Sequence, residues 1–296
     1  MRKFGLILVL TVLALGAFTA QATPIATLTQ HSDFYPEDTT IFATLRTDDG
    51  YIEALDGVLQ RANAYIPGLL PPGAGLNDVL DAFAQDAFGA DYESAIGSWL
   101  GDVASVGVTI SAETFEGTRA PSGLLTASIT DREAATNFVQ SFIDEQFRFA
   151  EYDVTEGDDF TVFATPERRF GPDGPSFAIS DDYLFAGVFE ADLPLAAPEN
   201  ALSGDDAYNN TLELFPEDDY NILLYANIGA INRLNMQTLE MMTRPGDMPG
   251  GLMALTELST AVETTAFAAT ILGGDTLTLD TVTGPVDIEA FEPLGD

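Results

Sequence analysis

The alternation of apolar and polar positions divides the chain into short strand-like runs and longer helix-like runs. The strand-like runs are rich in β-branched and aromatic residues, and the helix-like runs repeat an apolar residue every three or four positions. The predicted strands cover residues 39–46, 103–111, 123–130, 148–155, 160–165, 177–180, 183–189, 220–227, 262–272 and 276–284. The predicted helices cover residues 51–62, 76–88, 130–143, 205–214 and 228–242. Hairpins interleaved with amphipathic helices predict an α+β fold with antiparallel sheet.

Two distant stretches of the chain show the same order of elements. One reads "FYPEDTTIFATLR" from Phe34 and the other reads "FPEDDYNILLYAN" from Phe215. Each continues into a predicted helix, a loop rich in Pro and Gly, and a hairpin. Two unrelated α+β segments that share short motifs by chance are the alternative. The pattern favours a duplicated strand–helix–helix–hairpin module, with helices packed on one face of the antiparallel sheet or sheets.

This repeat, together with the two ends of the chain, predicts five segments. Residues 1–22 are expected to be a signal peptide and residues 23–33 an N-terminal tail. Residues 34–200 are expected to form the first module, which contains inserted hairpins, and residues 201–283 the second, shorter module. Residues 284–296 are rich in Pro and acidic residues, so we expect a disordered acidic tail.

The N-terminus has the pattern of a secretory signal. Arg2 and Lys3 precede an apolar run over residues 4–18, and Ala20-Gln21-Ala22 fits a cleavage site for small residues. The run is shorter than the roughly 20 residues that span a bilayer, although an uncleaved anchor remains the alternative. No later run is long and apolar enough to cross a membrane. The sequence therefore predicts a protein that is secreted or lies in the periplasm or at the exterior of the cell envelope.

The composition is strongly acidic, with a formal net charge of −36. Such a surface repels the phosphates of nucleic acids and the headgroups of anionic lipids, so nucleic-acid binding is not expected. It attracts cations and basic peptides. The alternative is that the acidic coat serves solubility alone, including solubility in high salt.

Four segments in this order resemble a known bacterial secreted family, the "domain of unknown function 3352". They are "FYPEDTTIFATLRTDDGYIEALDGVL" from residue 34, "YESAIGSWLGDVASVGV" from residue 92, "LLTASITDREAATNFVQSF" from residue 124 and "LSGDDAYNNTLELFPEDDYNILLYANI" from residue 202. The motifs "WLGD-VA-VGV" and "ITDREAA" are the most specific. The resemblance implies export and a role other than catalysis, and it transfers no site residue.

The residue types needed for common catalytic sites are scarce. The chain has one histidine, His31, and no cysteine, which excludes the usual zinc sites and any disulfide. His31 falls in the predicted tail, where we expect it to be solvated. Catalysis by a Ser-His or Cys-His pair would have to run through this residue and is therefore not expected. The acidic residues, 47 in number, are too many for their pattern to test paired-carboxylate chemistry.

Repeated Asp-Asp pairs give a weak indication of a calcium site. The candidate ligands are Asp158, Asp159, Asp181 and Asp182, which lie in predicted turns. Calcium prefers clustered oxygen ligands. Asp is also common in turns because it bonds nearby backbone N–H groups, and this alone explains the placement. No other cofactor is expected.

Two apolar loops at matching places in the repeat are the candidate ligand-binding residues. They contain Leu69 and Leu70 in the first copy, and Met241, Met242, Met248 and Met253 in the second. Flexible thioethers suit adaptable binding surfaces, although they also fill ordinary cores. The sequence thus favours a soluble exported protein with a binding or structural role, through an apolar groove for a lipid, a peptide or a protein partner. The alternative is a carboxylate-dependent extracellular hydrolase.

Overall fold

The fold is described from a computed structural model, which covers residues 22–66, 71, 73–111, 114, 121–166, 174–234, 264–272 and 276–284. The predicted signal peptide and the predicted acidic tail lie outside these residues, except for Ala22 and Gly284. No helix within the described ranges is long and apolar enough to span a membrane.

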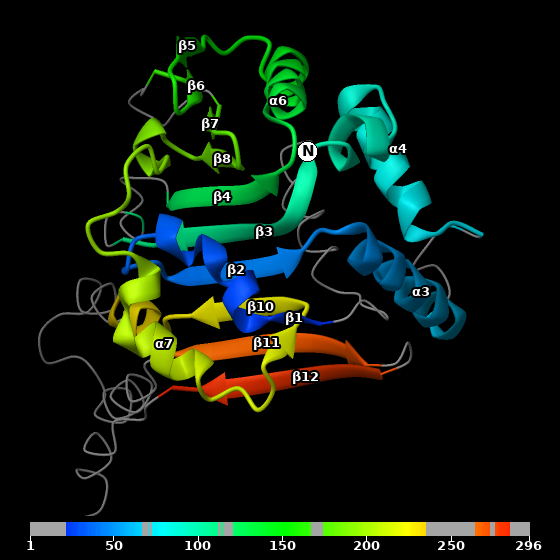
Figure 1. The fold of residues 1–296 in the computed structure, drawn as a ribbon, viewed down its shortest axis with the longest axis vertical. Coiled ribbons are helices and arrows are strands. Elements are labelled where there is room, and N and C mark those ends of the chain that lie inside the picture. Colours follow the sequence, from blue (N-terminus) through cyan, green and yellow to red (C-terminus); the bar gives the residue numbers. More distant parts are fainter. Residues whose placement is uncertain are drawn as a thin grey trace, which may run out of the picture.

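Ten antiparallel strands form one sheet in the order β12-β11-β10-β2-β3-β4-β8-β7-β6-β5 (Figure 1). The strands are β2 Ile41–Arg46, β3 Leu100–Thr109, β4 Ser122–Ile129, β5 Asp153–Glu156, β6 Thr161–Ala164, β7 Ser176–Ile179, β8 Tyr183–Gly187, β10 Ile222–Ala226, β11 Thr265–Leu272 and β12 Thr276–Thr283. Each of them falls within or overlaps a run of apolar and β-branched residues that predicted a strand. The expected α+β class with antiparallel sheet is therefore confirmed.

The strand order is the same on both sides of the β2–β10 pair. From β2 the sheet continues outward through β3 and β4, and from β10 it continues through β11 and β12. Ala43 pairs with Leu224, and the pairs Ile41–Ala226 and Leu45–Ile222 lie symmetrically about it. In each half the first strand is followed by a helix before the chain returns to the sheet (α3 Asp49–Tyr65 after β2; helical residues 228–234 after β10).

Caps in the sequence set the ends of several helices. The Asp48 side chain accepts a hydrogen bond from the backbone N–H of Tyr51 at the start of α3. The next helix, α4 (Leu76–Phe88), ends at Gly89, whose φ of 70° is the left-handed conformation that glycine adopts without a Cβ clash. The helix α6 (Arg132–Gln146) begins two residues after the predicted start at residue 130. Its N-cap is Asp131, whose side chain accepts a hydrogen bond from the backbone N–H of Ala134.

Helices cover both faces of the sheet, so the expectation of helices on one face is corrected. We call the face that carries Phe42, Leu124 and Leu223 the first face. The helices α2 (Ile25–Leu28) and α7 (Asp206–Leu212) pack there through Leu28 and Tyr208. The opposite, second face contacts α3 and α4 near Leu45, and α6 near the residues Ile129, Ile179 and Leu184. Central strands that are apolar on both faces need cover on both sides.

The segment expected to be an N-terminal tail is folded onto the first face. Residues 23 and 24 form β1 (Thr23–Pro24), which pairs with β9 (Asp219–Tyr220). The helix α2 and the 3₁₀ helix η2 (Gln30–Phe34) follow, and they cross in front of the sheet in Figure 1. Leu28 is fully buried, and its carbonyl accepts a hydrogen bond from Thr44 on β2. The prediction that His31 is solvated is wrong, because this packing leaves the side chain of His31 with no exposed surface.

Candidate functional site

The residues predicted to line an apolar groove cannot be placed. Leu69, Leu70, Met241, Met242, Met248 and Met253 all lie outside the described residues. The groove itself therefore stays a prediction.

The four candidate calcium ligands lie in two turns at the same end of the sheet. Asp158 and Asp159 precede β6, and Asp181 and Asp182 follow β7, its neighbour. Asp181 forms an ion pair of 2.9 Å with Arg132. Within the described part of the chain, no three His, Asp or Glu side chains gather closely enough to hold a metal ion. The geometry of these turns therefore adds no support to a calcium site.

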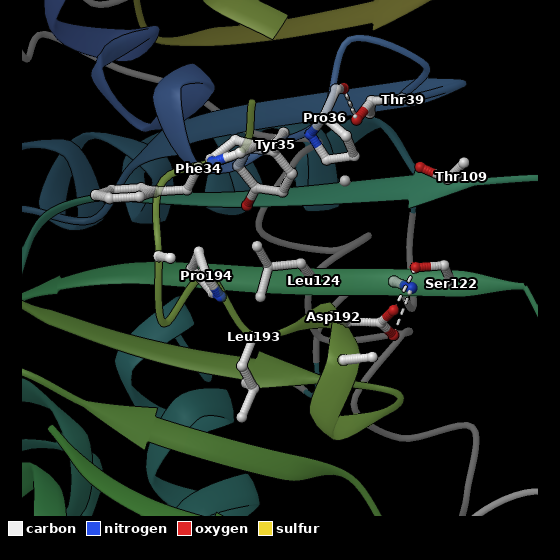
Figure 2. Close-up of a pocket in the computed structure, with 15 residues that line it drawn as sticks. Phe34, Tyr35, Pro36, Thr39, Thr109, Ser122, Leu124, Asp192, Leu193 and Pro194 are labelled. Carbon is white, nitrogen blue, oxygen red and sulfur yellow. Dashed lines mark hydrogen bonds between the residues drawn. The ribbon is translucent and has the colours of Figure 1, made fainter. Parts of the chain in front are cut away.

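A cavity of about 240 Å³ lies on the first face, where three separate segments meet (Figure 2). Figure 2 shows Phe34, Tyr35 and Pro36 on one side, Leu124 on the strand beneath, and Leu193 and Pro194 on the opposite side. The full set of lining residues is Phe34, Tyr35, Pro36, Thr39, Gly107, Thr109, Ser122, Gly123, Leu124, Ala191, Asp192, Leu193, Pro194, Ala196 and Pro198. Most of these are apolar, and three are prolines, whose rings keep their shape on binding.

Tyr35 shapes the floor of this cavity. Its ring lies across β3 at Gly107, and a methyl group added to Gly107 would overlap the ring. The Tyr35 hydroxyl donates to the hydroxyl of Thr126 on β4 at 3.1 Å. Burial raises the pKa of Tyr35 well above its ordinary value, so the phenol stays neutral. The Tyr35 ring is thus a fixed part of the cavity floor, available for packing against a ligand and not for proton transfer.

Asp192 is the one carboxylate among the lining residues, and its hydrogen bonds connect two segments of the cavity lining. It accepts hydrogen bonds from the Ser122 hydroxyl at 2.5 Å, from the Phe189 N–H at 3.0 Å and from the Gly123 N–H at 3.3 Å. The bonds from Ser122 and Gly123 join the 3₁₀ helix η4 (Glu190–Asp192) to the start of β4, and the bond from Phe189 caps η4 itself. Dashed lines beside Asp192 in Figure 2 mark bonds of this carboxylate to the start of β4. The Asp192 oxygens therefore accept hydrogen bonds from within the protein, although the negative charge of Asp192 remains beside the cavity.

The surroundings of the cavity are acidic. Glu37 and Asp38 stand between the lining residues Pro36 and Thr39, and Glu190 precedes the lining residue Ala191; all three acidic side chains are exposed. No Arg or Lys is among the lining residues. The arrangement is an apolar hollow inside a negative field, which favours a ligand with an apolar group and a positive charge.

A second, more open hollow of about 560 Å³ lies at β9, β11 and β12. It is lined by Ala22, Pro216, Glu217, Asp219, Thr270, Thr278 and Asp280. Asp280 accepts a hydrogen bond from the Tyr220 hydroxyl at 2.9 Å. This hollow lacks the aromatic and leucine side chains that supply affinity for an apolar ligand. The cavity at Tyr35 is therefore the better candidate for ligand binding.

His31 forms a separate polar cluster on the first face. Its Nδ1 lies 2.9 Å from the Ser105 hydroxyl on β3, and its Nε2 lies 3.0 Å from the Ser128 hydroxyl on β4. The ring packs edge-on against Tyr183, with centroids 5.5 Å apart. Burial lowers the pKa of His31 to about 4, so the imidazole is neutral at physiological pH.

No pattern in the sequence indicates the Tyr35 cavity. "FYPED" is half of the predicted repeat, and "LPLAAP" at residues 193–198 lies outside every predicted strand and helix. The one available signal is the content of proline and apolar residues in these two segments. Residues 34–39 and 191–198 lie side by side only because both segments pack on β3 and β4, and this packing is a property of the tertiary structure.

Comparisons of the chain with protein families, with curated proteins and with solved structures found no match.

Proposed function

We propose that this chain is an exported binding protein that holds an apolar group of a positively charged ligand, such as a basic peptide, in the cavity at Tyr35. The observation that carries the proposal is the apolar hollow formed by three prolines, two aromatic rings and two leucines beside the exposed Glu37, Asp38 and Glu190. Apolar contact supplies affinity, and the negative field selects the charge of the ligand.

A peptide fits these observations better than an anionic lipid does. The net charge of −36 and the acidic rim oppose a phosphate headgroup. A cavity of about 240 Å³ accommodates a single phenyl ring or branched aliphatic group but not a long acyl chain. The ligand is therefore expected to place one apolar side chain in the cavity and its positive charges over the rim.

We also propose that the sheet arose by duplication of the β2–β3–β4 unit. The symmetric pairing of β2 with β10 about Ala43 and Leu224 supports this idea. So does the shared strand order on either side of that pair, and so does the repeat of Phe34-Tyr35-Pro36-Glu37-Asp38 as Phe215-Pro216-Glu217-Asp218. In this view the N-terminal segments and the hairpins β5–β6 and β7–β8 are additions to a two-fold core.

Export and family membership complete the proposal. The basic and apolar N-terminus with its small-residue cleavage site supports secretion or delivery to the periplasm or the cell-envelope exterior. The segments that resemble the domain of unknown function 3352 support placement in that bacterial secreted family. The alternative of a carboxylate-dependent hydrolase has less support, because Asp192 in the cavity is already bonded to three protein donors.

Filling the cavity tests the binding function. Ala196 is an exposed lining residue, whereas its neighbour Ala197 is exposed but does not line the cavity, so Ala196→Trp and Ala197→Trp form a matched pair. The probe is a fluorescein-labelled pentapeptide with phenylalanine between two pairs of arginines, and its binding is followed by fluorescence anisotropy. A second probe carries alanine in place of the phenylalanine.

We expect the phenylalanine peptide to bind about 30-fold more tightly than the alanine peptide, because burial of a phenyl ring contributes about 2 kcal/mol. Ala196→Trp should abolish this difference, and Ala197→Trp should leave it unchanged. Added salt should weaken both peptides, since the rim acts through charge. Equal binding of the two peptides, or equal effects of the two variants, would refute the proposed site.

A further inference from the structure

A partly exposed serine, which is not among the residues that line the Tyr35 cavity, lies against the buried histidine. Ser128 is partly exposed near the end of β4, and His31 behind it has no exposed surface. The Ser128 Oγ lies 3.0 Å from the His31 Nε2. This is the distance at which an imidazole accepts a proton from a serine hydroxyl in nucleophilic catalysis.

The hydrogen bonds behind His31 determine which ring nitrogen carries the proton. The Thr44 hydroxyl donates its one proton to a carbonyl, that of Leu28 at 2.7 Å or that of Ala104 at 3.3 Å. Towards Ser105 the Thr44 oxygen can therefore only accept, and the Ser105 hydroxyl donates to it at 3.0 Å. Since Ser105 has no second proton, it accepts from His31 Nδ1–H at 2.9 Å.

This sequence of donors leaves His31 Nε2 without a proton. A neutral imidazole with its proton on Nδ1 presents a lone pair at Nε2, so the Ser128 hydroxyl is the donor in the 3.0 Å bond. Ser105 and Thr44 thus act as positioning residues, and they hold the tautomer in which His31 can remove a proton from Ser128. In serine hydrolases an aspartate holds the same tautomer of the base.

Two further features surround the Ser128 hydroxyl. The pairing of β3 with β4 shifts register between Leu100 and Ala104, so Ser128 faces an irregular part of β3; such bulges are common beside active sites, where they redirect side chains. The side-chain amide of exposed Gln30 donates to the Ser128 Oγ at 3.3 Å. It is therefore placed to donate to an oxygen that gains charge next to Ser128.

From this geometry we propose that Ser128 is an acyl-accepting nucleophile, with His31 as its general base and Gln30 as a donor to the developing oxyanion. The Ser128 Oγ forms a bond to the carbonyl carbon of an ester while its proton passes to His31 Nε2. The tetrahedral intermediate then expels the alcohol or phenol, which takes that proton from Nε2 and leaves an ester on Ser128. Water attacks this ester by the same proton route, releases the acid and restores the serine.

The charges near the site define the substrate class. Exposed Asp33 and Asp182 act electrostatically on Tyr183, the side chain that packs against His31 and pairs with Ser128 across β4 and β8. This negative surrounding favours neutral or cationic esters over anionic ones. Burial also disfavours the imidazolium that forms during attack, so the reaction is slow and needs a good leaving group.

The first test is acylation of the full chain by p-nitrophenyl acetate. We expect a burst of p-nitrophenol that approaches one equivalent, and one acetyl group on Ser128 in the intact mass and the peptide map. Ser128→Ala should remove the acetyl group and lower the rate at least about 100-fold, the scale of general-base assistance to a nucleophile. Ser94→Ala is the control, because Ser94 is exposed and lies outside the site; it should leave the rate unchanged.

The second test reads the tautomer directly. Because the chain has one histidine, its two ring nitrogens give unambiguous ¹⁵N resonances. We expect the proton on Nδ1 in the wild type. Ser105→Ala removes the acceptor for that proton, so part of the histidine should convert to the Nε2–H form, and the acylation rate should fall roughly 10-fold while the fold is kept.

Several results would overturn the proposal. They are acetyl groups spread over surface residues, a Ser128→Ala variant that reacts as fast as the wild type, no acylation at all, or a wild-type histidine protonated on Nε2. None of these outcomes bears on peptide binding at the Tyr35 cavity, which is measured with a different probe and different variants.

Discussion

Buried, neutral His31 should make the protein sensitive to mild acid, and the effect can be calculated. Burial lowers the pKa of His31 from its ordinary value of 6.5 to about 4 in the folded protein. At a pH between these two pKa values, His31 in the unfolded chain binds a proton that the folded chain does not bind. The stability associated with neutral His31 is therefore fully present above about pH 6.5 and is lost as the pH falls towards about 4.

The magnitude follows from this pKa difference. Between about pH 7.5 and about pH 5, proton binding to the unfolded state costs the wild type about 2 kcal/mol of unfolding free energy, and the full loss near the folded pKa is about 3 kcal/mol. His31→Gln cannot take up this proton. At the higher pH the variant should be less stable by roughly 1–3 kcal/mol, because the hydrogen bonds to Ser105 and Ser128 are disturbed. At the lower pH most of this gap should disappear.

Urea unfolding at the two pH values measures the effect. Trp99 is the one tryptophan and is 3% exposed, so its fluorescence reports global unfolding. The many carboxylates are common to both proteins, and their contribution cancels when the two unfolding free energies are subtracted. A wild-type-minus-variant difference that stays the same at both pH values would refute the neutral, buried state of His31.

Two substitutions, one of them with a matched control, test the packing, and a third tests a helix cap. Gly107→Ala should lower the unfolding free energy in the urea assay by about 2–3 kcal/mol, because the added methyl group displaces the Tyr35 ring. Gly204→Ala is the control, because a Cβ at Gly204 meets no atom within 4 Å; it should change the unfolding free energy by less than about 0.5 kcal/mol. Leu28→Ala should cost about 3 kcal/mol in thermal or urea unfolding, and a negligible effect would mean that the N-terminal segment is not part of the core. Asp131→Ala should cost about 1 kcal/mol by loss of the α6 cap, and unchanged stability would contradict the assigned N-cap.

Local patterns were sufficient to predict most elements of the fold. The β-branched run at residues 39–46 became β2, and the helix over 76–88 ends at Gly89 as its sequence suggests. These elements are specified by side-chain periodicity and by backbone preference, both of which are local. The later start of α6 has a local cause too, because Thr130 and Asp131 are both residue types that favour the N-cap position.

The N-terminal segment shows what local patterns miss. Residues 23–33 are too few and too irregular to show a helical or strand period, so the sequence predicts a tail there. Their order comes from the sheet, through the pairing of Thr23 with Tyr220, the burial of Leu28 and the hydrogen bonds of His31 to β3 and β4. Long-range contacts of this kind leave no periodic signal in the segment that makes them.

Both candidate sites depend on such long-range contacts. The position of His31 in the predicted tail led to the expectation that this residue is solvated. In the structure, Ser105 and Ser128 contact it from two neighbouring strands. The cavity was missed because Tyr35, Leu124 and Pro194 come from three separate segments. The sequence shows the composition of such sites, and the tertiary structure shows how they are assembled.

The most direct test of the proposed binding function is a crystal structure of the protein soaked with the arginine-flanked phenylalanine peptide. The account predicts density for the phenyl ring between Pro36, Leu124 and Pro194, with arginine side chains near Glu37 and Glu190. A peptide bound at another place on the surface, or an unchanged cavity at saturating peptide, would contradict it.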